Sequence, residues 1–234
     1  MPLKQRLFCF TAASLMISSI SATTPDLTNY ASFIPKNWKV LEKTQGDLNR
    51  DGQADLVLIA EDTHPESIVK NESLGNPQLN LNPRKLMVLL QSKQGYQLAA
   101  SNSSLPTEGD ADSPCLADPL GESEVLKIHN GVLHISLHYW LSCGSWYVTN
   151  KTYTFRYQDQ AFKLIGYDSN DFHRASGDIS EQSINFSTGK IKSTSGQNEF
   201  EESAQPPKIQ WTELKNKYSL SLEHIQFSEH YGFQ

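Results

Sequence analysis

The chain has 234 residues, of which 38% are hydrophobic and 20% are charged. This composition is typical of a globular protein and is too apolar for an intrinsically disordered one. Acidic residues outnumber basic residues by 26 to 20, which gives a formal net charge of −6. Because no basic patch is present that would neutralise phosphates, we expect no nucleic-acid partner.

The first 22 residues have the layout of a secretory signal peptide. Lys4 and Arg6 form a short positive region, an apolar run follows over residues 7–20, and Ser21 and Ala22 are small enough for cleavage. A buried helix or a membrane anchor is the alternative, but a membrane helix needs about 20 apolar residues. We therefore expect cleavage after Ala22, a periplasmic or secreted protein, and no membrane span in the mature chain.

Two of the three cysteines, Cys115 and Cys143, follow this segment. In an exported protein an even pair most simply forms a disulfide, and two separate buried thiols are the alternative. Closing a loop of this length would stabilise the fold by roughly 3–4 kcal/mol in the chain-entropy model.

Strand patterns dominate the first region, residues 23–104. Short strands are predicted at 38–44 and 96–100, while 54–60 and 86–90 are apolar on both faces and bounded by turn residues. Such short, wholly apolar runs are typical of central strands that are covered on both sides. Little helix is expected.

The second region, residues 105–234, begins with a polar connection and continues as antiparallel strands. Residues 133–141 alternate between apolar and polar side chains, the pattern of a half-buried strand. Hairpins are predicted at 147–157 with 162–167 and at 184–186 with 191–193. The predicted fold is mainly β, with antiparallel sheets arranged as a sandwich or a partial propeller, and the two regions either form one domain or pack as two.

Short helices are expected only at residues 26–33 and 211–217. The connection at 101–124 carries six acidic residues and no Lys or Arg. We expect a mobile surface loop anchored by Cys115, with a second cation site or a basic partner as the alternative.

Residues 46–55, Gly-Asp-Leu-Asn-Arg-Asp-Gly-Gln-Ala-Asp, predict a calcium loop. Calcium takes six to eight oxygen ligands, so a binding loop must curl around the ion. Gly52, at loop position 6, permits the sharp turn. Oxygen ligands would come from the side chains at positions 1, 3, 5 and 9 and from the carbonyl at position 7: Asp47, Asn49, Asp51, Asp55 and Gln53. A solvated Asp/Asn/Gly turn is the alternative.

The loop differs from an EF-hand because position 12 is Leu58 and strands flank it. Its arrangement resembles the calcium loops of FG-GAP and VCBS-type repeats, in which such a loop joins two strands of a propeller blade. The resemblance covers about residues 38–100, one blade, and implies Asp47, Asn49, Asp51 and Asp55 as ligands. Without a bidentate Glu, we expect a structural ion with an affinity of about 10⁻⁴–10⁻³ M.

The second region, with Asn185-Phe-Ser-Thr-Gly189, resembles a pattern found in uncharacterised bacterial exported proteins. That resemblance implies a β architecture and an envelope location. It implies no activity.

No catalytic motif is found. The sequence has no Gly-x-Ser-x-Gly elbow, no His-Glu-x-x-His and no Cys-x-x-Cys. His134 and His138 share a strand face but lie roughly 13 Å apart, too far to hold one metal. Asp168, Asp171 and Asp178 are the remaining candidates for an acid/base pair.

The sequence therefore favours an exported calcium-binding β protein with a non-enzymatic binding role. Its partner would be a protein or an envelope polymer, and an envelope inhibitor or immunity protein is the more specific hypothesis. The alternative is a hydrolase of a cell-envelope substrate that uses loop carboxylates as acid and base.

Overall fold

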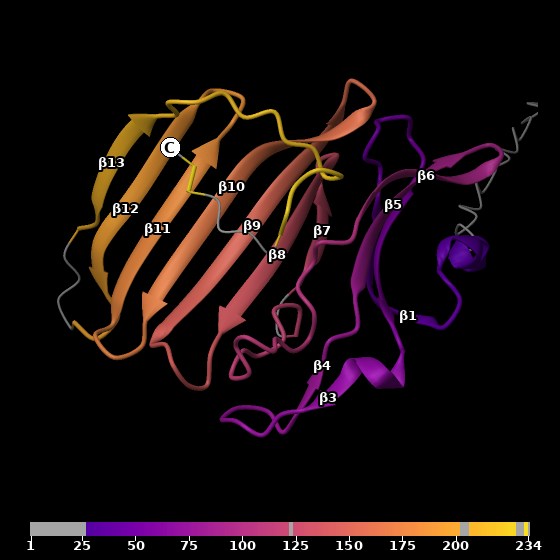
Figure 1. Ribbon diagram of the computed structural model, residues 1–234. Helices are drawn as coiled ribbons and strands as arrows, with labels where there is room; N and C mark the ends of the chain where they lie inside the picture. The colour runs from indigo at the N-terminus through magenta and orange to yellow at the C-terminus, as the bar shows by residue number, and fades with distance from the viewer. Residues whose placement is uncertain (1–26, 122–123, 202–205, 228–231, 234) are drawn as a thin grey trace, which may run out of the picture.

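Two antiparallel sheets face each other in the computed structural model, which describes residues 27–121, 124–201, 206–227 and 232–233 (Figure 1). The smaller sheet has four strands in the order β1-β2-β5-β6, and a separate hairpin, β3-β4, lies between β2 and β5 in the chain. The bounds are β1 Trp38–Gly46, β2 Asp55–Asp62, β3 Ile68–Lys70, β4 Gln78–Asn80, β5 Arg84–Ser92 and β6 Gly95–Asn102. The predicted signal peptide lies outside the described residues.

The larger sheet has seven strands that neighbour one another in strict chain order, from β7 to β13. It curves so that the smaller sheet lies against the β7–β10 side (Figure 1). The bounds are β7 Leu126–His129, β8 Val132–Trp140, β9 Tyr147–Gln158, β10 Ala161–His173, β11 Asp178–Asn185, β12 Lys190–Asn198 and β13 Lys208–Glu213. The mainly β, antiparallel fold with little helix is thus confirmed.

Of the two expected helices, the first is present and the second is not. The first helix is present as a single 3₁₀ segment, η1, at Leu27–Phe33, and a second, η2, covers only Pro65–Ser67. The prediction of a helix at residues 211–217 is wrong, because β13 extends to Glu213 and pairs with β12. Trp211 lies opposite Lys192 in this pairing. Pairing with a neighbouring strand outweighs weak local helix preference there.

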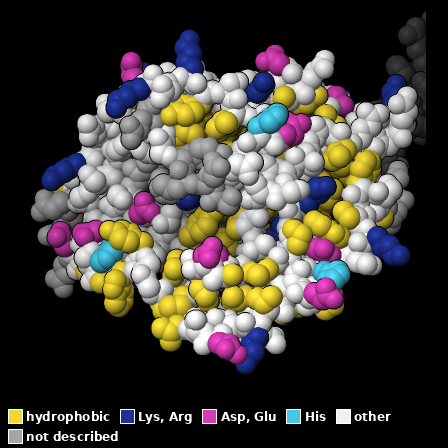
Figure 2. All heavy atoms as spheres, in the orientation of Figure 1, with side chains coloured by type: hydrophobic (Ala, Val, Ile, Leu, Met, Phe, Trp, Pro, Cys, Tyr) yellow, Lys and Arg dark blue, Asp and Glu magenta, His cyan; other side chains and the backbone are white. Residues whose placement is uncertain are grey.

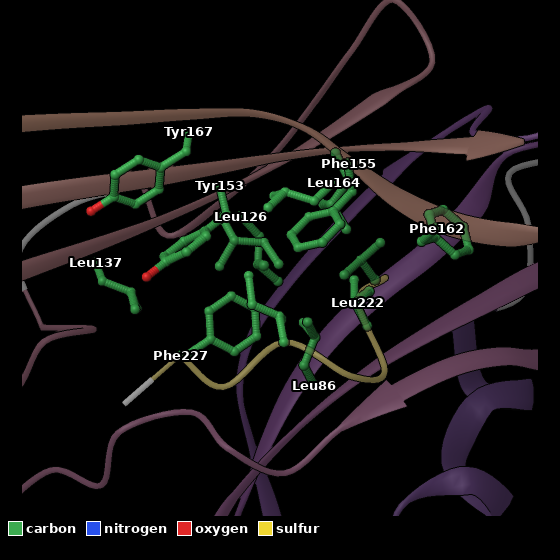
Figure 3. Close-up of a cluster of buried hydrophobic side chains, with 14 of the residues drawn as sticks. Leu86, Leu126, Leu137, Tyr153, Phe155, Phe162, Leu164, Tyr167, Leu222 and Phe227 are labelled. Atoms are coloured by element: carbon green, nitrogen blue, oxygen red, sulfur yellow. The ribbon is translucent and has the colours of Figure 1, made fainter. Parts of the chain in front are cut away.

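The two sheets share one hydrophobic core (Figure 3). Val57 and Ile59 of β2 belong to the same buried cluster as Tyr153 and Phe155 of β9. The opposite face of β2 and β5 forms a second cluster, which is packed against Tyr30, Phe33, Ile34 and Trp38. The central strands of the small sheet are therefore covered on both sides, as their apolar sequences predict.

The C-terminal segment fills the space between the sheets. Leu222, Ile225 and Phe227 are fully buried, and the Phe227 ring lies edge-on to Tyr153 with centroids 5.0 Å apart (Figure 3). The Asn102 side chain donates hydrogen bonds to the carbonyls of Leu222 and Ile225, at 2.7 and 2.8 Å. Packing and hydrogen bonding together fix this segment.

A buried ion-pair network fixes the acidic connection. The Arg84 guanidinium donates to Glu61 at 2.8 Å and, through two nitrogens, to both carboxylate oxygens of Asp118 at 2.6 and 2.7 Å. Arg84 and Glu61 are each 1% exposed, and Lys39 also contacts Glu61. The connection expected to be mobile is therefore held by a buried arginine as well as by Cys115.

Replacing Arg84 with Ala should lower the free energy of unfolding by about 3–5 kcal/mol, because Glu61 would be left as a buried carboxylate without its main partner. Urea unfolding measures the change. Lys70→Ala removes one partner of the exposed Lys70–Glu72 pair and should have little effect. Similar small losses in both variants would contradict this account.

Candidate functional site

The predicted calcium loop connects β1 and β2. Arg50 and Gly52 have positive φ angles, 65° and 84°, so the backbone turns sharply at the position where the sequence predicts a glycine-dependent turn. The Gly52 site is open, because a side chain beginning there would meet no other heavy atom within 4 Å of its Cβ. The constraint on that residue is therefore its backbone conformation.

The oxygen side chains of this loop bond to its own backbone amides. Asp47 accepts from the amides of Arg50 and Gly52 at 2.6 and 2.9 Å, and Asn49 accepts from Asp51 at 3.0 Å. Asp51 accepts from the Gln53 amide at 2.8 Å, which lowers the pKa of Asp51 below its usual value. These bonds curl the loop and leave further lone pairs on the same oxygens.

Asp55 differs from the other candidate ligands because it is fully buried. Its two carboxylate oxygens accept hydrogen bonds from the amides of Leu48 and Gln91, at 2.8 and 2.9 Å. Desolvation raises the pKa of Asp55, and the two amides oppose that shift. Asp55 thus ties the loop to the end of β5.

The donor types in this turn fit calcium, because carboxylate and amide oxygens are the ligands that this hard cation prefers. Asp47, Asn49, Asp51 and Gln53 lie on the curled segment, and Asp55 lies beneath it. Within the described ranges, no group of three or more His, Cys, Asp or Glu side chains is gathered closely enough to hold a metal. A bound ion would therefore draw these carboxylates together.

The predicted disulfide between Cys115 and Cys143 is present, with Cα atoms 5.5 Å apart. It braces the loop after β8 against the acidic connection. Backbone bonds reinforce the contact, since the Ser142 amide donates to the Cys115 carbonyl and the Ala117 amide donates to the Trp140 carbonyl, both at 2.9 Å.

Beside this disulfide lies an aromatic group that the sequence analysis did not identify. The Arg174 guanidinium lies over the rings of Trp140 and Trp146, 5.4 and 5.7 Å from their centroids. It also donates to the carbonyls of Leu141 and Ser145, at 2.8 and 2.7 Å. We call Trp140, Trp146, Tyr147 and Arg174 the aromatic end of the large sheet.

Two members of the aromatic end face solvent. Trp146 is 61% exposed and Tyr147 is 55% exposed, and the Tyr147 ring packs edge-on against His173 at 4.7 Å. Figure 2 shows hydrophobic side chains gathered along the lower margin of the molecule, where the loops that follow β8 and β10 lie. The only sequence signal for this surface is the concentration of aromatic residues at 139–147.

The structure does not bring the candidate acid/base carboxylates together. Asp168 and Asp171 are three residues apart on β10 and therefore face opposite sides of the sheet. Asp178 accepts hydrogen bonds from Ser176 and Asn198, which lower its pKa. A general acid needs a raised pKa, so the arrangement offers no matched pair.

The paired histidines do not form a site either. On the outer face of β8, His138 contacts Asn150 at 2.7 Å and His134 contacts Thr154 at 3.2 Å. Both are therefore part of a polar sheet face, as expected from their spacing.

Comparisons of the chain with protein-family models, curated proteins and solved structures found no match. Across the part of the chain that the structure describes, no helix is long and apolar enough to cross a membrane. The functional argument therefore rests on the contacts of the chain itself.

Asp55→Ala should destabilise the protein by about 2–4 kcal/mol in calcium-free buffer, because the amides of Leu48 and Gln91 would lose their buried acceptor. Asp55→Asn keeps one acceptor and should cost less.

The pKa of Asp55 is raised on folding, so its contribution to the free energy of unfolding falls as the pH rises through that pKa. Denaturant unfolding in EDTA across acidic pH measures both effects, and a wild-type response in Asp55→Ala would refute the anchoring role.

Proposed function

We propose that the protein is an exported, calcium-binding β protein with a non-enzymatic role, which binds another protein of the cell envelope as an inhibitor or immunity protein does. The observation that carries this proposal is the exposed pair Trp146 and Tyr147 on a braced loop. Tryptophan, tyrosine and arginine are the residues most enriched at protein-binding hot spots.

The contacts that hold these aromatic residues in place support a binding role. Arg174 holds Trp146 through its ring and through the Ser145 carbonyl, and the disulfide at Cys143 fixes the same loop. A surface that is ordered before binding loses less conformational entropy on association. An envelope polymer would use the exposed rings differently, by stacking.

The export part of the proposal rests on two observations. A disulfide persists in oxidising compartments, and the Cys115–Cys143 pair is formed. The segment at residues 1–22, interpreted as a signal peptide, would direct the chain to such a compartment.

The calcium part of the proposal rests on the curled turn between β1 and β2. Asp47, Asn49 and Asp51 present oxygens within five residues, and Asp51 is exposed to solvent. At the affinity expected for an extracellular module, the ion would brace this turn and would not act as a signal.

The protein partner is tested by retention of envelope proteins on the immobilised mature chain. One protein should be retained by the wild type and by Trp211→Ala, and lost from Trp146→Ala. Trp211 is the matched control because it is a tryptophan of nearly the same exposure, 62% against 61% for Trp146, and lies on β13, the edge strand of the large sheet remote from β8 and β9. With the partner purified, Trp146→Ala should raise the Kd at least about tenfold, as expected for a hot-spot residue.

Equal retention by Trp146→Ala and the wild type would overturn the assignment of the aromatic end. Co-sedimentation with purified peptidoglycan, without any retained protein, would replace the protein partner by a polymer.

Calcium binding is tested by calorimetric titration and by unfolding with and without the ion. Calcium at 100 times the Kd should stabilise the wild type by about 2.7 kcal/mol. Asp51→Ala should lose this gain. Asp51→Asn keeps an acceptor for the Gln53 amide, so it should match the wild type in EDTA and still lose calcium binding. No binding below several millimolar, or unchanged binding in both variants, would reduce the loop to an ordinary turn.

A further inference from the structure

A polar cavity lies on the inner face of the large sheet, where β9–β12 extend beyond the hydrophobic core. Its volume is about 470 Å³, which falls within the range of about 300–1,000 Å³ typical of small-molecule sites. Hydroxyl, amide and charged side chains dominate its lining, among them Lys151, Tyr167, Ser169, Asp171, Gln182 and Ser193.

The cavity arises from a change of side-chain character along one face of each strand. Strand geometry places every second residue on the same face. On β9 the inner residues run from Phe155 and Tyr153 to Lys151, and on β10 from Tyr167 to Ser169 and Asp171. The tyrosine hydroxyls mark the boundary, since in Figure 3 those of Tyr153 and Tyr167 lie on the side of the cluster away from Phe162.

The same change occurs on the next two strands. On β11 the inner residue Ile184 is followed, toward the start of the strand, by Gln182. On β12 Ile191 is followed by Ser193, which pairs with Gln182. Four adjacent strands thus switch from apolar to polar at the same level of the sheet, where the core ends.

Lys151 is the unusual residue of this cavity, because it is a lysine that is only 9% exposed. Within the described part of the chain, its ammonium group makes no hydrogen bond and no ion pair. Its contact is the face of the Tyr139 ring, 4.9 Å from the nitrogen. Burial lowers the pKa of Lys151, and the nearby Asp171 opposes that shift.

Asp171 does not neutralise Lys151 by direct contact, because its carboxylate accepts the hydroxyl of Thr149 instead. Lys151 is mostly buried, but its ammonium borders the open cavity and has no acceptor among the described residues, so its three N–H donors are available to a bound ligand. A ligand that carries a single negative charge would provide the missing partner. A phosphate dianion fits less well, since Asp171 would repel its second charge.

We propose that this cavity binds a small carboxylic acid, with the ligand carboxylate on Lys151 and ligand hydroxyl or amine groups on Asp171 and the surrounding serines. Sugar acids and amino acids share this chemistry. The site is separate from the aromatic end, and it does not depend on the role proposed for that surface.

The test uses the folded, full mature chain and isothermal titration with four probes: D-glucuronate, D-alanine, D-glucose and inorganic phosphate. We expect saturable binding of glucuronate or alanine, with glucose and phosphate at least tenfold weaker. Binding of glucuronate alone would identify a sugar acid, and binding of alanine alone would identify an amino acid; either result supports the proposal.

Lys151→Met keeps the length of the side chain and removes its charge. It should weaken carboxylate binding at least tenfold while melting close to the wild-type temperature, because the ammonium that it removes makes no hydrogen bond or ion pair among the described residues and contacts only the Tyr139 ring. Lys192→Met is the control, because Lys192 lines a separate polar pocket bordered by Asp168 and Glu181.

Three results would overturn the proposal. They are equal affinity for glucose and glucuronate, no saturable binding of either acid at millimolar concentrations, and undiminished binding in Lys151→Met.

Discussion

Each sheet has one apolar face that it cannot bury by itself, and the structure depends on pressing these two faces together. Val57 and Ile59 on one side, and Tyr153 and Phe155 on the other, belong to one cluster. The connection between β6 and β7 joins the two sheets. Arg84 holds this connection in place, because it binds Glu61 on β2 and Asp118 on the connection at the same time.

The candidate sites lie where this shared core ends. The acidic turn projects from the β1–β2 edge, the aromatic end lies beyond the last core residues of β8 and β9, and the cavity begins where the inner face becomes polar. The candidate sites are therefore held by the shared core without being part of it. Residues at these sites can change without loss of core packing.

Features that depend on local pattern could be predicted from the sequence, because they need only neighbouring residues. Residues 54–60 and 86–90 form doubly covered strands, and the cysteine pair is joined. Contacts between distant residues could not be predicted. The acidic connection has no basic residue of its own, and its partner Arg84 lies 34 positions before Asp118. Likewise, Arg174 follows the end of β10 and Trp140 ends β8, so their contact exists only because the sheet brings these two strands to either side of β9.

The distance along the chain between the core-filling residues and their partners has a consequence for folding. Leu222, Ile225 and Phe227 are buried between the sheets, and Asn102, which donates to the carbonyl of Leu222, precedes it by 120 positions. Forming such a contact closes a long loop, and proteins dominated by contacts between distant residues fold slowly. We therefore expect the interior to be completed late in folding, when both sheets and this segment come together.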